Sequence, residues 1–135
     1  MKNTKVWWFL AILWCVVIAI ATRQPFFTGD STEELLTNPL FDSAILNFVA
    51  RKLVHISAFG LLAFLFWRAL RGRSYRYVLA FGLATLYGAI DEWHQSFIPD
   101  RSGAVTDVFI NSFGACLVLV LVYSVMRNKR LSQKQ

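Results

Sequence analysis

Four mostly apolar runs dominate the 135-residue sequence, and each is about as long as a membrane-crossing helix. They cover roughly residues 6–22, 53–70, 77–92 and 105–126. As a helix, the uncharged first run would be about 25 Å long, close to the roughly 30 Å thickness of a hydrocarbon core. We therefore expect an all-α membrane protein with four antiparallel transmembrane helices.

The composition agrees with a bilayer environment. Hydrophobic residues make up 56% of the chain, and the mean hydropathy is +0.48. A soluble domain is usually about 45–50% apolar, even when glycine is counted. Because 135 residues suffice for one domain and are few for two, we expect a single membrane domain over residues 1–135, with its motif-bearing core at 51–126.

The first apolar run permits two interpretations. Lys2 and Lys5 precede it, and Ala19-Ile20-Ala21 has the small-x-small pattern of a secretory cleavage site. However, the run is longer than a typical signal-peptide core and begins with Trp7 and Trp8. Aromatic residues beside cations are typical of a helix end at the membrane interface. We favour an uncleaved first helix, with a cleaved signal peptide as the alternative.

The charges are distributed unevenly along the chain. Ten of the 14 basic residues lie in the two tails and around the second connection, whereas all eight acidic residues lie in or beside the first and third connections. Basic residues mark the cytoplasmic side of a membrane protein. We therefore expect a multi-pass membrane protein with both termini in the cytoplasm.

The first connection, residues 23–50, is the only long one. Ser31 and Glu34 form a capping-box pattern within it, ahead of two leucines. A short helix on the outer membrane surface is the expected structure, so an interfacial segment should separate the first two transmembrane helices.

Nucleic-acid binding and cofactor binding by cysteines both receive little support. The net charge of +6 suggests nucleic acid, but the basic residues flank apolar runs instead of lining one face of a folded module, so we expect no nucleic-acid partner. Cys15 and Cys116 lie inside different apolar runs, where the simplest interpretation is a small buried side chain. We expect no cofactor.

A group of polar residues interrupts the apolar pattern and gives the best indication of function. In the expected topology, the start of the second helix, the end of the third and the start of the fourth all face outward, so their side chains can meet. Ionisable residues within membrane segments are functional candidates by default. We call the following residues the polar cluster: Lys52, His55, Asp91, Glu92, Gln95, Arg101, Asp107 and Asn111.

Two chemical roles are open for this cluster. A carboxylate beside an imidazole can support general acid–base chemistry, which makes His55, Asp91, Glu92 and Asp107 candidate catalytic residues. The alternative is a set of hydrogen-bonded struts, because buried polar groups in a bilayer need partners. The candidate substrate-binding residues are Lys52, Gln95, Arg101 and Asn111.

Arg101 and Lys52 suit an anionic group such as a lipid phosphate, or else they form salt bridges with nearby carboxylates. The spacing of histidine and carboxylates fits no zinc signature, and we expect no metal.

The spacing of the polar residues resembles that of the VanZ-like membrane proteins. The resemblance rests on Lys52-x-x-His55-x-x-x-Phe59, Asp91-Glu92-x-x-Gln95-x-x-x-Pro99-x-Arg101 and Asp107-x-x-x-Asn111-x-x-Gly114. It implies a small multi-helix membrane protein that acts at the outer face on the cell envelope and is associated with teicoplanin resistance. His94 departs from the pattern, which has an apolar residue at this position.

Three hypotheses about function follow. In the first, an outer pocket binds or modifies a lipid-linked or cell-wall component, so that the partners are membrane lipids and a lipid-linked wall precursor. In the second, the protein is not an enzyme and its polar cluster only locks the helices together. The third is a small transporter, for which Thr85 alone would continue the polar residues toward the cytoplasm.

Overall fold

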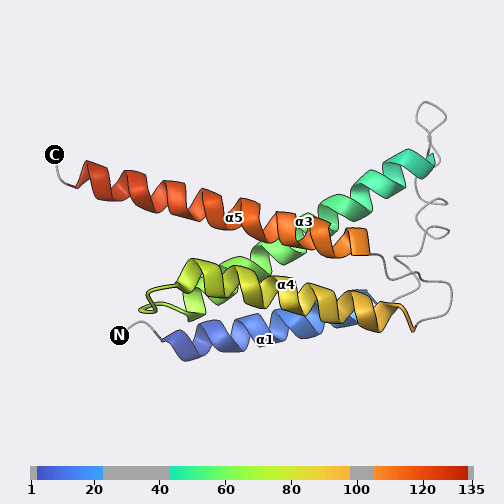
Figure 1. Ribbon diagram of the computed structural model, residues 1–135, viewed down its shortest axis with the longest axis horizontal. Coiled ribbons are helices and arrows are strands. Elements are labelled where there is room, and N and C mark those ends of the chain that lie inside the picture. Colours follow the sequence, from blue (N-terminus) through green and yellow to red (C-terminus); the bar gives the residue numbers. More distant parts are fainter. Residues whose placement is uncertain (1–2, 23–42, 98–104, 134–135) are drawn as a thin grey trace.

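The computed structural model describes residues 3–22, 43–97 and 105–133, with the side chains of 43–48 excepted. Within these ranges the protein consists of helices and short turns (Figure 1). The helices are α1 (Thr4–Ala21), α3 (Ser43–Ala69), α4 (Arg76–Gln95) and α5 (Val105–Ser132). The predicted all-α class is confirmed.

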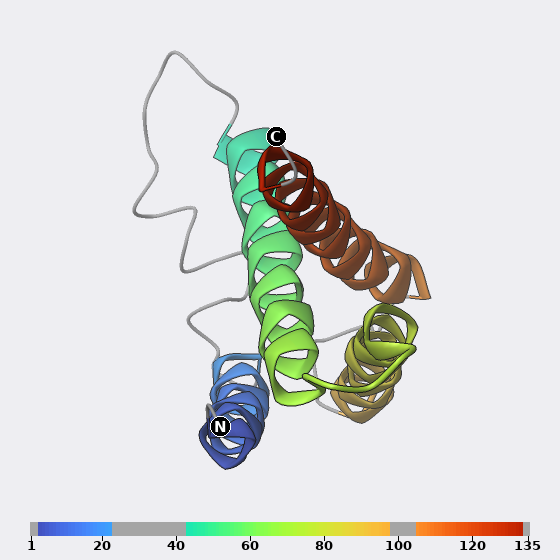
Figure 2. The ribbon, with the colours of Figure 1, turned by 90° about the vertical axis from the view of Figure 1, so that its left-hand side faces the viewer.

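Successive helices run in opposite directions, and α3 lies at the centre of the bundle. The start of α1, the turn between α3 and α4, and the end of α5 all lie at one end of the molecule (Figure 1). Seen from that end, α3 has α1 on one side and α4 and α5 on the other (Figure 2). α3 contacts each of the other three helices. The described residues of the polar cluster lie at the opposite end.

Three of the four helices are long and apolar enough to cross a membrane: α1, the Val49–Ala69 part of α3, and α5. Their outer faces carry large apolar side chains that are well exposed, such as Phe9, Leu53 and Phe109. Extensive apolar exposure of this kind suits lipid and not water. The protein is therefore a membrane protein. The remaining helix, α4, corresponds to the third predicted one and falls outside this group because it begins with Arg76 and carries charged residues in its last turns.

Helix boundaries differ from the expected ones. α3 begins at Ser43, inside the segment expected to be a connection, because residues 44–50 contain no proline or glycine to break a helix. α4 continues through Gln95, so that three residues of the polar cluster lie on its last turns. α5 continues to Ser132, where Lys129 and Arg130 complement the negative end of the helix dipole. The expected interfacial helix near Ser31 lies outside the described residues.

The turn between α3 and α4 is as short as predicted. Gly72 within it has a φ of 92°, a left-handed conformation that costs little for glycine because it lacks a Cβ atom.

α1 packs into the core of the bundle. Ala11 and Ile18 are buried, and the indole nitrogen of Trp14 donates a hydrogen bond to the carbonyl oxygen of Ala58 on α3 at 3.0 Å. The hydroxyl of Tyr87 on α4 donates to the carbonyl oxygen of Cys15. Both bonds would be lost if α1 left the bundle.

We therefore expect α1 to remain in the mature protein. The measurement is the intact mass of protein purified from membranes. A mass that includes residues 1–21 supports the uncleaved helix, because its removal would open the core formed with α3 and α4. A mass that lacks them would show that this segment is a signal peptide.

The two cysteines lie in different environments. Cys15 is half-buried, whereas Cys116 is exposed. The expectation that both are buried was therefore wrong for Cys116. In a membrane protein an apolar run can place a small side chain against lipid as well as against another helix, and the run alone does not distinguish the two.

Candidate functional site

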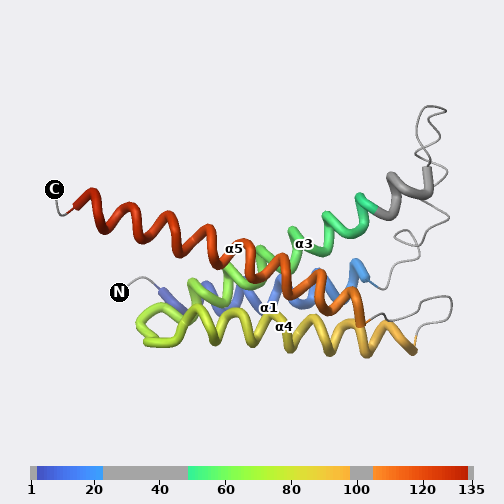
Figure 3. The backbone as a smooth tube through the Cα atoms, turned by 45° about the horizontal axis from the view of Figure 1, so that its top comes forward, coloured from blue at the N-terminus to red at the C-terminus, as the bar shows by residue number. Residues whose placement is uncertain are grey.

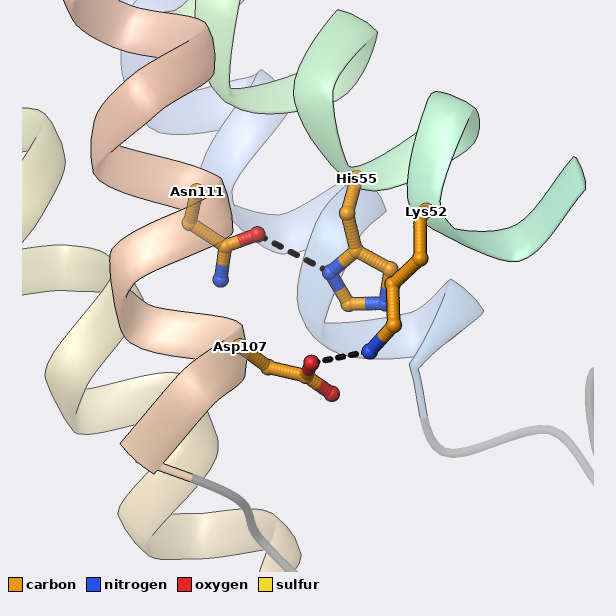
Figure 4. Close-up of polar contacts among 4 residues, drawn as sticks. All are labelled: Lys52, His55, Asp107 and Asn111. Carbon is orange, nitrogen blue, oxygen red and sulfur yellow. Dashed lines mark hydrogen bonds and ion pairs between the residues drawn. The ribbon is translucent and has the colours of Figure 1, made fainter. Parts of the chain in front are cut away.

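Two polar pairs connect α3 to α5 at the end of the bundle opposite the α3–α4 turn (Figure 4). The ammonium group of Lys52 forms an ion pair with the carboxylate of Asp107, and these side chains are 23% and 17% exposed. Next to this pair, Nδ1 of His55 lies 3.0 Å from Oδ1 of Asn111. The two pairs form successive rungs between the helices.

Helical spacing explains why the rungs form. Lys52 and His55 are three residues apart on α3, and Asp107 and Asn111 are four apart on α5, so each helix presents its two side chains on one face. Asp107 also lies in the first turn of α5, where its negative charge is favourable near the positive end of the helix dipole.

A close approach of the two backbones brings the rungs together. A Cβ atom built on Gly114 would lie 2.8 Å from the Cα atom of Ile56 on α3 and closer still to its carbonyl oxygen. A Cβ atom on Gly60 would meet the side chain of Val118 at 2.6 Å. Small residues at such crossings are typical of membrane helix pairs. Gly114 is therefore a packing residue, with α3 as its neighbour.

His55 is held on two sides. Its ring is stacked with that of Phe59, one turn along α3, with centroids 6.4 Å apart and an angle of 4° between the planes. With Oδ1 of Asn111 as the acceptor, Nδ1 of His55 carries the proton and Nε2 of the neutral ring keeps its lone pair. Nε2 is then the nitrogen that can accept a proton or a hydrogen bond from a ligand.

Asn111 is the most deeply buried of the described cluster residues. It is 0% exposed, and its amide nitrogen has no hydrogen-bond partner among residues 3–22, 43–97 and 105–133. Most buried polar atoms in proteins are paired. An unpaired donor beside His55 is one position at which an acceptor group could bind.

A second polar group lies on α4. The amide nitrogen of Gln95 donates to Oδ2 of Asp91 at 2.8 Å, and the hydroxyl of Thr22 donates to Oδ1 of Asp91 at 3.2 Å. Asp91 and Gln95 are each 7% exposed. The carboxylate thus joins the end of α1 to the last turns of α4.

Gly88 brings this second group against the rungs. A Cβ atom on Gly88 would lie 3.4 Å from Cβ of Asn111 and 3.2 Å from the ring of Phe59. Asp91 follows Gly88 by three residues on the same face of α4. Gly88 therefore places the second polar group next to the Asn111 and Phe59 side chains.

The remaining predicted residues differ in their placement. Glu92 is buried, at 4% exposure, and Arg101 lies outside the described residues. His94 is exposed. Over the described ranges, no three His, Cys, Asp or Glu side chains are arranged to hold a metal ion.

Two contributors to the site were not expected from the sequence. Thr22 ends the first apolar run, and only its position at the same membrane depth as Asp91 could have indicated their hydrogen bond. Gly88 contributes by packing, because side chains of Phe59 and Asn111 occupy the space above it.

Comparison with protein-family models identifies the family of the chain. The family model VanZ/LLP1 matches residues 7–127, a range that includes most of α1 and α5 and all of the polar cluster. No curated protein and no solved structure matches the chain significantly. The match agrees with the resemblance found in the spacing of the polar residues, and the chain belongs to the VanZ/LLP1 family.

Proposed function

We propose that the polar cluster binds or modifies a lipid-linked or cell-wall component at the outer face of the bacterial plasma membrane. In doing so, the protein lowers susceptibility to teicoplanin-like glycopeptides, the phenotype with which the family name is linked. The proposal rests mainly on the His55–Asn111 pair. It combines a partly accessible imidazole with a buried amide whose nitrogen has no hydrogen-bond partner in the described part of the chain.

The distribution of charge supports an outward-facing cluster. The described basic residues at the other end of the bundle are Lys5, Arg68, Arg71, Arg73, Arg76, Arg127, Lys129 and Arg130, and no acidic residue occurs in the segments that hold them. The positive-inside rule assigns that end to the cytoplasm. The start of α1 and the end of α5 are then cytoplasmic, and the polar cluster is extracytoplasmic.

The cluster offers distinct groups for recognition and for proton transfer. Lys52 supplies a cation for a phosphate, with Arg101 as a second cation in a segment outside the described residues. Nε2 of His55 accepts a hydrogen bond from a bound ligand, or its proton if the ligand is modified. Asp107 pairs with Lys52, and Asp91 accepts hydrogen bonds from Gln95 and Thr22, so these two carboxylates hold the cluster in position. Glu92 is buried beside Asp91 and is a third carboxylate of the proposed site.

We expect His55→Gln to abolish protection against teicoplanin while the protein still accumulates in the membrane. Glutamine keeps a polar side chain beside Asn111 but has no basic nitrogen. The measurement is the susceptibility of a sensitive host that expresses each variant, with membrane abundance quantified. His94→Gln is the matched control, because His94 is exposed on the adjacent helix. Full protection by His55→Gln at normal abundance would refute the proposed role of the imidazole.

A second candidate is a module without a ligand, in which the cluster only locks the helices. The two rungs between α3 and α5 and the Thr22–Asp91 bond between α1 and α4 favour it. The two candidates differ in one respect: a lock tolerates any replacement that restores folding, whereas a binding site requires the polar groups themselves.

A further inference from the structure

α4 and α5 diverge toward the basic end of the bundle, far from the polar cluster. The two helices lie side by side near the start of α5 and separate toward its end (Figures 1 and 3). A hollow of about 680 Å³ lies between them, and its lining includes Tyr77, Tyr123, Met126, Arg127 and Arg130. We call it the basic hollow.

A second hollow adjoins the first. It measures about 410 Å³ and is lined by apolar side chains, among them Phe81, Leu119 and Val120. Tyr77 and Tyr123 line both hollows, and their rings meet edge to face with centroids 5.8 Å apart. We call the second hollow the apolar groove, and the two tyrosines lie where it meets the basic hollow.

The basic hollow is suited to an anion. Arg127 and Arg130 are three residues apart on α5, so both guanidinium groups can serve one ligand. The sequence contains no Asp or Glu in residues 1–29, 43–90 or 108–135, so no acidic side chain of these segments competes for the two arginines. Arginine binds phosphate oxygens through two parallel hydrogen bonds.

We propose that this site between α4 and α5 binds one anionic phospholipid. Its phosphate lies against Arg127 and Arg130, and one acyl chain lies along the apolar groove past Phe81 and Val120. A cationic hollow continuous with an apolar groove matches the two parts of such a lipid. The positive-inside rule assigns this end of the bundle to the cytoplasm, so the lipid belongs to the cytoplasmic leaflet. Anionic lipids of that leaflet attract basic residues near the membrane surface.

A second copy of the chain fits the site less well. A copy with the same orientation in the membrane would bring its own basic end to this depth, and arginines would then face arginines. Like charges at an interface are unfavourable. The apolar groove argues likewise against free phosphate, which would leave it unfilled.

The test is native mass spectrometry of the full chain in detergent, with phosphatidylglycerol or phosphatidylcholine added at equal concentration. We expect preferential retention of phosphatidylglycerol by the wild type. The variant Arg127→Gln/Arg130→Gln should weaken this retention about tenfold or more, since each cation near the surface favours anionic lipid. The matched control, Arg71→Gln/Arg73→Gln, removes the same charge from the exposed turn at the same end and should bind as the wild type does.

A third variant tests the groove without changing charge. Val120→Trp places a larger side chain at an exposed position of the groove lining and should also reduce phosphatidylglycerol retention. Equal retention of both lipids, or no difference between the two arginine variants, would overturn the proposal. A dimer that forms without lipid and is dissociated by Val120→Trp would also overturn it, because the groove would then bind a second copy of the chain. Displacement of phosphatidylglycerol by inorganic phosphate, combined with unchanged retention in Val120→Trp, would overturn it as well, because the site would then bind only the phosphate. None of these outcomes depends on the polar cluster at the other end.

Discussion

Gly114→Ala is expected to lower the stability of the bundle by about 1–3 kcal/mol, the usual cost of overpacking a close-packed contact. The added Cβ atom would overlap the carbonyl oxygen of Ile56 and lie 2.8 Å from its Cα atom. These are backbone atoms of α3, which cannot rotate away as a side chain can. α3 and α5 must therefore separate, and the two polar rungs between them lengthen.

Thermal unfolding of the purified protein in detergent measures this effect. Gly82→Ala is the matched control, because no atom lies within 4 Å of a Cβ atom at Gly82 in the described part of the chain. It should leave the melting temperature unchanged or raise it, since alanine favours a helix by about 1 kcal/mol over glycine. If Gly114→Ala melts like Gly82→Ala, the close crossing of α3 and α5 is wrong.

The second large effect is expected at the ion pair. Lys52→Met should destabilise the protein by about 3 kcal/mol, the lower end of the range for breaking a buried pair. The lower end applies because the Lys52 and Asp107 side chains keep 23% and 17% exposure. The cost arises from the carboxylate of Asp107, which is left without its cation in a largely apolar environment.

The double variant Lys52→Met/Asp107→Leu should recover most of that stability. Apolar side chains of similar size can replace a buried ion pair at little cost. A residual loss of about 0.5 kcal/mol is expected because Asp107 no longer complements the helix dipole. Melting curves of the wild type, the two single variants and the double variant complete a double-mutant cycle and give the coupling energy between the two residues. If the losses of stability in the single variants simply add up in the double variant, the pair does not interact.

Helical periodicity was sufficient to predict which polar residues share a face. Lys52 with His55 and Asp107 with Asn111 follow from spacings of three and four, and the charge distribution indicated that α3 and α5 would present them at the same end. The pairing itself did not follow. Which side chain of α5 meets Lys52 depends on the crossing of the helices, and the Gly114–Ile56 contact that positions this crossing is a tertiary feature.

The ends of the helices were harder to predict than their polar faces. Arg51 and Lys52 suggested a membrane interface, so the second helix was expected to begin there, yet α3 extends back to Ser43. A helix does not end where a membrane ends unless a breaker or a cap stops it. Likewise, Asp91 and Glu92 were expected to close the third helix, but neither proline nor glycine occurs in residues 89–98, and α4 continues to Gln95.

The central claim is that the polar cluster is a binding site and not only a lock. Teicoplanin susceptibility of a host that expresses Lys52→Met/Asp107→Leu tests it most directly, because this variant should fold while lacking both charges. With wild-type protection as the reference and membrane abundance matched, we predict that the double variant gives no protection. Protection equal to that of the wild type would contradict the claim and leave the cluster as a structural lock.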